Sequence, residues 1–385
     1  MRAALLILAG CSFHGAAVPT GGDAGADGRP AIDARACSGP CVHRTITVPA
    51  ARIGATALTD FPLLLSIDQD ASLKANARGD GFDIGFADAT GGALDYERMA
   101  YDATTGRLVA WIRLPAVPPS TDYTLAMTYG DATVSVDQQR PRAAWGTGYA
   151  GVYHLEEATG QARDATKNNN HATPSGGLQL AATGMVGNGI AFRAPSGTPA
   201  TYPALRIPDA ATLHPIATLG TLSAWVWFEA PAAGRYQTIL TWSKAGSNDG
   251  FSWTSQADGD HYFYPWSGDT QNNNLVANPF VASAWYHVAI TLDYAMRDVK
   301  IFINGAPAVI AMKGVNSGHW TAAAMPADWL WGWNPAFGTQ PSNFVGRLDE
   351  IRLETTVRSA SFIAATYANQ RAPAAFYVLG DPVPQ

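Results

Sequence analysis

The stretch TLSAWVWF, residues 221–228, carries the pattern on which the fold prediction rests. Every second residue from Leu222 to Phe228 is apolar, so these residues share one face if the stretch is a β-strand. Trp225 and Trp227 then lie on the opposite face. The pattern predicts a strand with one side in a hydrophobic core and bulky aromatic groups on its other side.

Strand-like runs continue on both sides of this stretch. They cover residues 237–242, 250–254, 285–293, 299–303 and 344–353. The run at 299–303 ends in Asn304-Gly305, a dipeptide that favours a tight hairpin turn. Residues 359–369 are predicted to form a closing helix. Enough runs lie between residues 151 and 370 for a two-sheet jelly roll, and we place this domain at residues 149–381.

A second group of short apolar runs precedes this domain. They lie at residues 44–48, 61–67, 82–86, 107–115 and 123–130, and Gly, Pro and Asp separate them. Only residues 71–77 have a helical pattern. Strands of this length with such punctuation predict a small β-sandwich at residues 42–144. The predicted fold class is therefore all-β, with two sandwiches.

The composition excludes several classes of protein. The 385 residues carry a net charge of −6, only 15% are charged, and there are 38 Gly and 12 Trp. Disordered chains have more charge and fewer aromatic residues. No Lys/Arg cluster is present, so we expect no nucleic-acid partner. Because no run of about 18 apolar residues occurs, a multi-span membrane protein is excluded.

The N-terminus, MRAALLILAGC at residues 1–11, resembles a bacterial lipoprotein signal that ends in a lipobox. The resemblance implies that Cys11 is lipidated and anchors an exported protein to the cell envelope. Ser12 implies the outer membrane of a Gram-negative bacterium. An ordinary secretory signal is the alternative. Residues 12–41, rich in Gly, Ala and Asp, are predicted to form a disordered, flexible tether.

Two cysteines remain after Cys11, in the run Cys37-Ser38-Gly39-Pro40-Cys41. An even pair in an exported protein indicates a disulfide, because the compartment is oxidising. Two cysteines alone do not complete a zinc shell, so a metal site is the weaker interpretation.

The first predicted sandwich resembles the bacterial domain of unknown function 2341 family. The resemblance rests on Phe61-Pro62, residues 80–88, residues 111–115 and Tyr129-Gly130. The family has no known activity and implies no catalytic residue. Three acids in its second segment, Asp80, Asp83 and Asp88, lack the spacing of a calcium-binding EF-hand loop. We therefore predict that they form Asx turns with nearby backbone N–H groups.

The second predicted sandwich resembles the laminin-G-like branch of the concanavalin A-like lectin/glucanase fold. The landmarks occur in the family's order, and the resemblance implies a concanavalin A-like jelly-roll sandwich. They lie at residues 151–157, 164–172, 187–192, 222–226, 285–289, 301–305 and 344–352.

The resemblance also implies one structural Ca²⁺ ion. The loop that begins at Asp164 matches the family's calcium loop, and Asp349 matches an Asp of its last strand, so Asp164, Asn168 and Asp349 are the candidate ligands. Lys167 departs from the family, which has Gly there. The alternative is that Asp164 and Asn168 hold a polar loop together by hydrogen bonds.

No catalytic residue is predicted. Glucanases of this fold carry two carboxylates on one strand face, in a Glu-x-Asp-x-x-Glu pattern that is absent here. The adjacent acids Glu156-Glu157 and Asp349-Glu350 would point to opposite faces of a strand. We therefore expect a protein that is not an enzyme; a divergent glycoside hydrolase and a structural envelope component are the alternatives.

Aromatic residues supply the candidate ligand site. Trp329, Trp331 and Trp333 would share one strand face, and the first two fit core positions better than surface positions. Four residues are the candidates for ligand contact: Trp333, Trp266, Tyr264 and Asn334. The expected function is non-catalytic recognition of a glycan or a protein at the cell surface.

Overall fold

The computed structural model describes most of the chain outside the N-terminus and several loops of the second sandwich. The described residues are 37, 39–194, 202–229, 236–243, 250–256, 258–264, 274–277, 279–293, 295–311, 327–334 and 342–385. The predicted signal, Cys11, residues 12–36 of the tether and Trp266 lie outside them.

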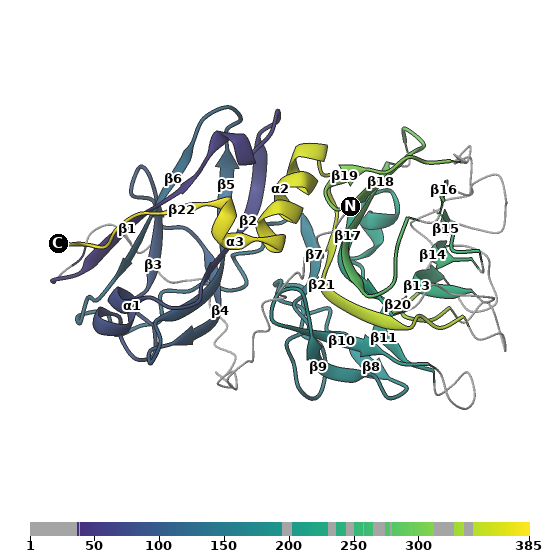
Figure 1. The fold of residues 1–385 in the computed structure, drawn as a ribbon, viewed down its shortest axis with the longest axis horizontal. Coiled ribbons are helices and arrows are strands. Elements are labelled where there is room, and N and C mark those ends of the chain that lie inside the picture. Colours follow the sequence, from purple (N-terminus) through teal and green to yellow (C-terminus); the bar gives the residue numbers. More distant parts are fainter. Residues whose placement is uncertain are drawn as a thin grey trace, which may run out of the picture.

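The first part of the chain forms the predicted β-sandwich (Figure 1). One sheet has the order β22-β1-β6-β3, with β23 also paired to β1, and the other has the order β2-β5-β4. Strand β4 was not expected from the sequence. The elements are β1 (Val42–Val48), η1 (Ala50–Arg52), β2 (Leu58–Ile67), α1 (Ala71–Asn76), β3 (Gly85–Asp88), β4 (Tyr96–Asp102), β5 (Arg107–Val117) and β6 (Tyr123–Tyr129).

The second part is the predicted two-sheet jelly roll. Its eight-stranded sheet has the order β19-β18-β17-β12-β21-β10-β9, with β7 also paired to β21, and its seven-stranded sheet has the order β16-β15-β14-β13-β20-β11-β8. The eight-stranded sheet comprises β7 (Tyr149–Tyr153), β9 (Gln179–Thr183), β10 (Asn188–Phe192), β12 (Leu219–Phe228), β17 (Ala284–Asp293), β18 (Asp298–Ile303), β19 (Ala306–Pro307) and β21 (Gly346–Glu354). The seven-stranded sheet comprises β8 (Thr173–Ser175), β11 (Ala204–Ile207), β13 (Gln237–Ser243), β14 (Gly250–Ser255), β15 (His261–Tyr264), β16 (Asn274–Val276) and β20 (Trp329–Trp331). A short 3-10 helix, η3 (His214–Ala217), leads into β12.

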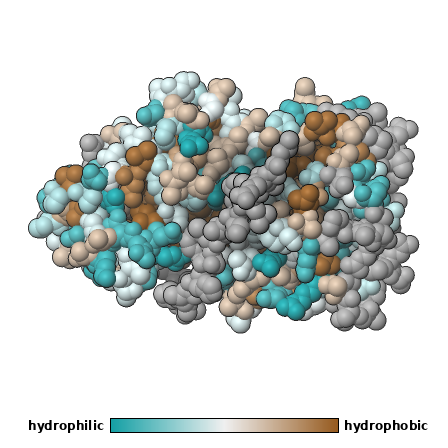
Figure 2. Space-filling view, in the orientation of Figure 1, coloured by the Kyte–Doolittle hydropathy of each residue, from teal (hydrophilic) through white to brown (hydrophobic). Residues whose placement is uncertain are grey.

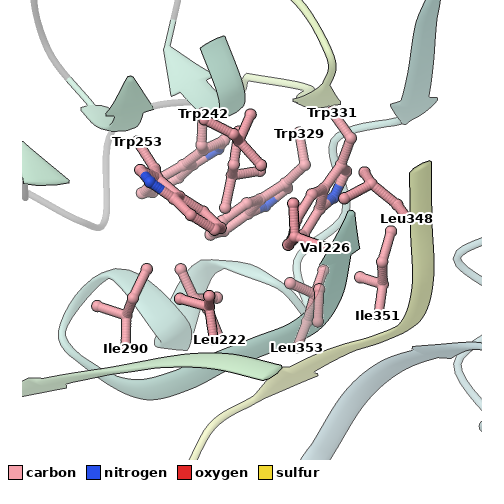
Figure 3. Packing of buried hydrophobic residues seen from close by; sticks show 14 of the residues in the cluster. Leu222, Val226, Trp242, Trp253, Ile290, Trp329, Trp331, Leu348, Ile351 and Leu353 are labelled. Carbon is pink, nitrogen blue, oxygen red and sulfur yellow. The ribbon is translucent and has the colours of Figure 1, made fainter. Parts of the chain in front are cut away.

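Tryptophans from the seven-stranded sheet fill the core between these two sheets (Figure 3). Trp329 and Trp331 are each 1% exposed, which confirms the core interpretation of these two residues. The rings of Trp242 and Trp329 stack with their centroids 5.1 Å apart. They face Leu222 and the other inward residues of β12, so the alternation in residues 221–228 has its predicted meaning.

The C-terminal segment returns to the first sandwich (Figure 1). It comprises α2 (Ala360–Arg371), α3 (Pro373–Phe376), β22 (Val378–Leu379) and β23 (Val383–Pro384). Both short strands pair with β1, and Phe362, Phe376 and Tyr377 belong to the first sandwich's core. The sequence prediction had assigned residues up to 381 to the second domain. This end of the range differs, because Phe362, Phe376 and Tyr377 are buried in the core of the first sandwich, while Ile363 of the same segment packs on the jelly roll.

Strand β2 lies at the edge of its three-stranded sheet, and the C-terminal segment supplies partners for that edge. The side chain of Asn369, at the end of α2, accepts a hydrogen bond from Leu64 N (2.7 Å) and donates one to Leu64 O (3.0 Å). The Tyr377 hydroxyl accepts from Ser66 N and donates to Ser66 O. These side chains therefore replace a neighbouring strand and keep the edge from pairing with another chain.

The disulfide prediction is confirmed, and the Asx-turn prediction is confirmed for Asp80 and Asp88. It is wrong for Asp83, whose carboxylate accepts from Arg78 N, five residues earlier, and from Gly130 N. Cys37 and Cys41 form a disulfide. Asp88 Oδ1 accepts hydrogen bonds from the backbone of Thr90 and Gly92, and both Asp80 and Asp83 accept from backbone N–H groups as well. In the described part of the chain, no helix combines the length and apolar character needed to cross a membrane.

We expect Asn369→Ala to lower the free energy of unfolding by about 2–4 kcal/mol, because Leu64 N and O would be left buried without partners. Chemical denaturation measures the change. Asn76→Ala is the matched control: Asn76 is exposed on α1, and its loss should cost less than about 0.5 kcal/mol. Equal effects of the two substitutions would contradict the role of Asn369.

Candidate functional site

The outer face of the seven-stranded sheet carries a row of side chains that runs across five strands. The register places Arg206, Leu330, Thr241, Ser252 and Tyr264 directly opposite one another on β11, β20, β13, β14 and β15. Their sequence neighbours on the same strands face the core. Because side chains alternate along a strand, the row lies on the side of the sheet that faces away from the other sheet.

Tyrosines form one end of this row. Tyr262 and Tyr264 are two residues apart on β15, so they share a face, and their rings stack with centroids 5.8 Å apart. Both side chains are half-buried, and the nearby Tyr236 is 40% exposed. Burial raises the pKa of Tyr264 to about 12, so its hydroxyl remains protonated at neutral pH and can both donate and accept.

The rest of the row consists of Leu330, two hydroxyl groups and one charged group. Ser252 Oγ lies 3.1 Å from Thr254 Oγ1, and Thr241 donates to the carbonyl of Phe251. At the far end, the exposed Arg206 forms an ion pair with Asp328 at 2.5 Å. Within the row Thr241 is fully buried, Leu330, Ser252 and Tyr264 are half-buried, and Arg206 is exposed.

The other predicted contact residues lie elsewhere. Strand β20 ends at Trp331, and Gly332 has a φ of +95°, so Trp333 does not continue the strand face shared by Trp329 and Trp331. Its half-buried ring packs edge-on against Tyr202, with centroids 6.0 Å apart. Asn334 is buried, and Trp266 lies outside the described residues. The structure therefore brings Tyr264 together with Tyr262 and Tyr236 rather than with Trp333.

Asp164 and Asn168 organise the loop that follows β7. Asp164 Oδ1 accepts hydrogen bonds from Val152 N and Thr166 N, and its Oδ2 accepts from Thr166 Oγ1 and Asn170 N. The Asn168 amide donates to the carbonyls of Tyr149 and Ala150. These contacts correspond to the hydrogen-bonding alternative that the sequence left open.

Asp349, the third candidate calcium ligand, is fully buried on β21. Its Oδ2 accepts from the N–H groups of Met185 and Val186, and burial raises its pKa well above the usual value. Its Oδ1 also accepts from Glu350 N, so three backbone N–H donors surround a carboxyl group that Ca²⁺ would need as a ligand, together with several other anionic or carbonyl oxygens. Among the described residues, no group of three or more His, Cys, Asp and Glu is placed to hold a metal. The three residues thus do not fit a calcium site in this arrangement, and calcium binding stays a prediction.

A buried charged cluster joins the two sandwiches, and no sequence pattern predicted it. His154, just after β7, lies between two carboxylates: its Nδ1 is 2.7 Å from Glu350 Oε1, and its Nε2 is 3.4 Å from Glu97 Oε2. Glu350 belongs to β21 of the second sandwich, whereas Glu97 belongs to β4 of the first. Trp145 also donates its indole N–H to Glu97 at 2.7 Å.

Aromatic rings enclose this cluster. The Arg352 guanidinium lies 3.3 Å from Glu350 and over the rings of Trp111 and Trp145, 4.6 and 5.2 Å from their centroids. His154 stacks on Trp111. Glu350 and Arg352 are at most 2% exposed, so these charges are screened little by water. The cluster therefore couples the positions of the two sandwiches through strong local charge interactions.

Burial and neighbouring charges shift the pKa values of His154 in this cluster and of the nearby Glu156. Burial opposes a charge on His154, but the carboxylates of Glu350 and Glu97 outweigh burial and raise its pKa well above the usual value. Burial raises the pKa of Glu156, two residues further, to about 7. Both groups hold protons at pH values where the unfolded chain releases them.

Comparison with family models agrees with this architecture. The model of the domain of unknown function DUF2341 matches residues 80–170, and the model of the concanavalin A-like lectin/glucanases superfamily matches residues 199–364. The chain combines a DUF2341 domain with a concanavalin A-like domain. The DUF2341 match extends beyond the expected boundary at residue 144 and includes His154 of the junction. None of the curated proteins is matched.

Solved structures resemble the chain only in fold. The binding domain of botulinum neurotoxin DC, in complex with rat synaptotagmin II, is 13% identical, with a TM-score of 0.46, over 58% of this chain and 52% of that domain. A Trypanosoma rangeli sialidase in complex with 2,3-difluorosialic acid is 14% identical, with a TM-score of 0.44, over 64% of this chain and 41% of the sialidase. The chain spans about half the length of the neurotoxin domains that it matches. Similarities of this size carry no information about function.

We expect Glu156 to lower the free energy of unfolding as the pH rises from about 5 to 7. Between the usual pKa of 4.5 and about 7, the folded protein keeps a proton on Glu156 that the unfolded chain releases, so this group costs stability with each unit of pH. The buried His261 and His287, whose pKa values are lowered to about 3, act in the opposite direction below 6.5, so the contribution of Glu156 is measured as a difference between variants. The stability of Glu156→Gln relative to the unmodified protein should rise between about pH 5 and 7 when unfolding is measured by urea at several pH values.

The matched control is Glu229→Gln, because Glu229 is exposed and lies at the end of β12, outside the junction. This variant should keep the slope of the unmodified protein. Identical slopes for Glu156→Gln and the unmodified protein would show that Glu156 does not titrate in this way.

Proposed function

We propose that the protein recognises a glycan without catalysis, through the outer face of the seven-stranded sheet of its concanavalin A-like domain. The stacked pair Tyr262 and Tyr264 is the observation that carries the proposal. Aromatic rings offer an apolar surface to the C–H groups of a sugar ring, while their hydroxyls remain available to polar groups. The fold belongs to a superfamily of lectins and glucanases, which is consistent with a sugar ligand.

The layout of the row supports a ligand that is longer than one sugar. Tyr264 and Arg206 lie four strand positions apart, which corresponds to about 19 Å at the usual spacing of ~4.8 Å between neighbouring strands. Each end carries exposed or half-buried polar groups, and between them only Thr241 is fully buried. A chain of several sugar units can contact an end of the row with its hydroxyls while one ring stacks on the tyrosines. The alternative is a protein that binds the same face, and a binding screen would distinguish it from a glycan ligand.

We also propose that the protein is exported and anchored by lipid at Cys11, with residues 12–41 as its tether. The proposal rests on the lipobox-like sequence and is supported by the disulfide Cys37–Cys41, since such bonds persist in oxidising compartments. A location on the cell surface would give the outer face of the seven-stranded sheet, which carries Tyr262 and Tyr264 and is called the tyrosine face below, access to glycans outside the cell.

A glycan array probed with the purified protein should show saturable binding, and Tyr264→Ala should weaken it about tenfold through the loss of the stacked ring. Tyr262→Phe keeps the ring and should bind nearly as well as the unmodified protein. Tyr123→Ala, in the first sandwich, is the matched control and should not change the affinity.

Two results would overturn the proposal. One is the absence of saturable binding to any glycan on the array. The other is the release of reducing sugar from a polysaccharide panel, which would show that the protein is a hydrolase rather than a recognition module.

Cys11→Ala should release the protein from the membrane fraction of cells that express it, because the acyl chains of the anchor would no longer be attached. Fractionation followed by detection of the protein measures the effect. Ser12→Ala is the control, because it leaves the lipid-accepting cysteine in place. Continued membrane attachment of the Cys11→Ala variant would refute the anchor.

A further inference from the structure

The opposite sheet of the second sandwich carries a different row of side chains on its outer face. Trp285 on β17, Trp227 on β12 and Arg347 on β21 lie directly opposite one another. The two indole rings pack edge to face, with centroids 5.8 Å apart, and the Arg347 guanidinium lies 5.5 Å from the centroid of Trp227. All three side chains are half-buried, although they point away from the core.

Helix α2 covers the neighbouring part of this face and leaves the row uncovered. Ile363 packs on Ala289 and Phe302, and one turn later Tyr367 packs against Trp225 and His287. Gln370, in the last turn, accepts the indole N–H of Trp225. Trp227 lies two residues beyond Trp225 on the same face, about 7 Å further along β12. The row therefore begins where the helix ends.

Two arginines give the row a local positive charge in a protein whose net charge is −6. Arg347 donates to the carbonyl of Thr183, and Arg193, which follows the neighbouring strand β10, donates to the side chain of Gln179. Among the described residues, no carboxylate forms an ion pair with either guanidinium. Ala191 on β10 lies opposite both Arg347 and Gln179, so the small Ala191 side chain separates Arg347 from Gln179, the residue that Arg193 contacts.

We propose that this row, Trp285, Trp227, Arg347 and Arg193, is a second binding site that takes a polysaccharide with carboxylate groups on its sugar rings. A guanidinium stacked on an indole is held in plane and presents its N–H edge, which matches the two oxygens of a carboxylate. The tryptophans offer apolar area to the adjoining sugar ring. Charge complementarity thus selects an acidic chain over a neutral one.

This site is independent of the tyrosine face. The two rows belong to different sheets, whose inner faces share one core, so one ligand cannot stack on the tyrosines and the tryptophans through the same sugar. The chemistry also differs, because the row on the seven-stranded sheet has its arginine, Arg206, already paired with Asp328.

The test is calorimetric titration of the full protein with an oligogalacturonide and with the same oligomer after its carboxyl groups have been reduced. The acidic oligomer should bind, and the reduced one should bind at least about tenfold more weakly, because each charge-assisted hydrogen bond is lost. Arg347→Gln should weaken binding of the acidic oligomer by a similar factor. Trp285→Ala should weaken binding of both oligomers.

Control variants separate this site from general charge and from the tyrosine face. Lys300→Gln removes an exposed positive charge from β18 of the same sheet and should leave the affinity unchanged. Tyr264→Ala should also leave it unchanged, whatever the glycan array shows for that variant. The melting temperature of each variant verifies that it folds. If Trp285→Ala does not fold, Trp227→Phe, which keeps a ring beside Arg347, is tested in its place.

Three results would overturn the proposal. The first is the absence of binding of the acidic oligomer at millimolar concentration. The second is equal affinity for the acidic and the reduced oligomer. The third is an affinity of the Arg347→Gln variant equal to that of the unmodified protein.

Discussion

The arrangement of the whole chain depends on the need of one strand edge for hydrogen-bond partners. Strand β2 packs against α2 and α3 of the C-terminal segment and lies at the edge of a three-stranded sheet. Asn369 and Tyr377 bind the exposed backbone of this edge from a segment that follows the second sandwich. A buried backbone group without a partner would cost about 1–3 kcal/mol, so this segment is part of the first sandwich's fold.

The return of the C-terminal segment has a consequence for the junction between the sandwiches. Because the chain leaves the first sandwich through β7 and comes back through α2, the two sandwiches are connected twice. Between these connections lie Glu97, His154, Glu350 and Arg352, enclosed by Trp111 and Trp145. Buried charges are tolerated only when they are paired, so the two sandwiches must keep the relative position that pairs them. The same burial makes the junction sensitive to pH.

The concanavalin A-like domain then presents two outer faces with different chemistry around one core. Its tryptophans lie both in the core and on an outer face. Trp329 and Trp331 fill the interior, whereas Trp227 and Trp285 lie on the outer face of the eight-stranded sheet. The tyrosine face has hydroxyl groups and an arginine that is paired with Asp328. The row of Trp227 and Trp285 on the other sheet has arginines without carboxylate partners among the described residues. The face drawn in Figure 2 shows hydrophobic residues in small separate groups among polar ones.

Local pattern determined much of the fold. Alternation fixed which side of residues 221–228 faces the core, Asn304-Gly305 marked the turn after β18, and Ser359 begins the closing helix as its N-cap. Tyr264 is a candidate from the sequence, because aromatic residues on a strand are visible there, and the structure places it on β15 beside Tyr262. Strand β4 was missed, since residues 96–102 are mostly half-buried and do not alternate clearly. Trp333 was placed on a strand that ends two residues earlier, because the positive φ of Gly332 cannot be read from composition.

The sequence by itself determined two β-sandwiches, their order, the disulfide and the residue types available for binding. These features depend on neighbours within a few positions, whose periodicity is written along the chain. Only the tertiary structure decided that the C-terminal segment belongs to the first sandwich, that His154 lies between Glu97 and Glu350, and that Trp227 adjoins Arg347. Each of these contacts joins residues far apart in the sequence, and strand order and register in a sheet decide which of them meet.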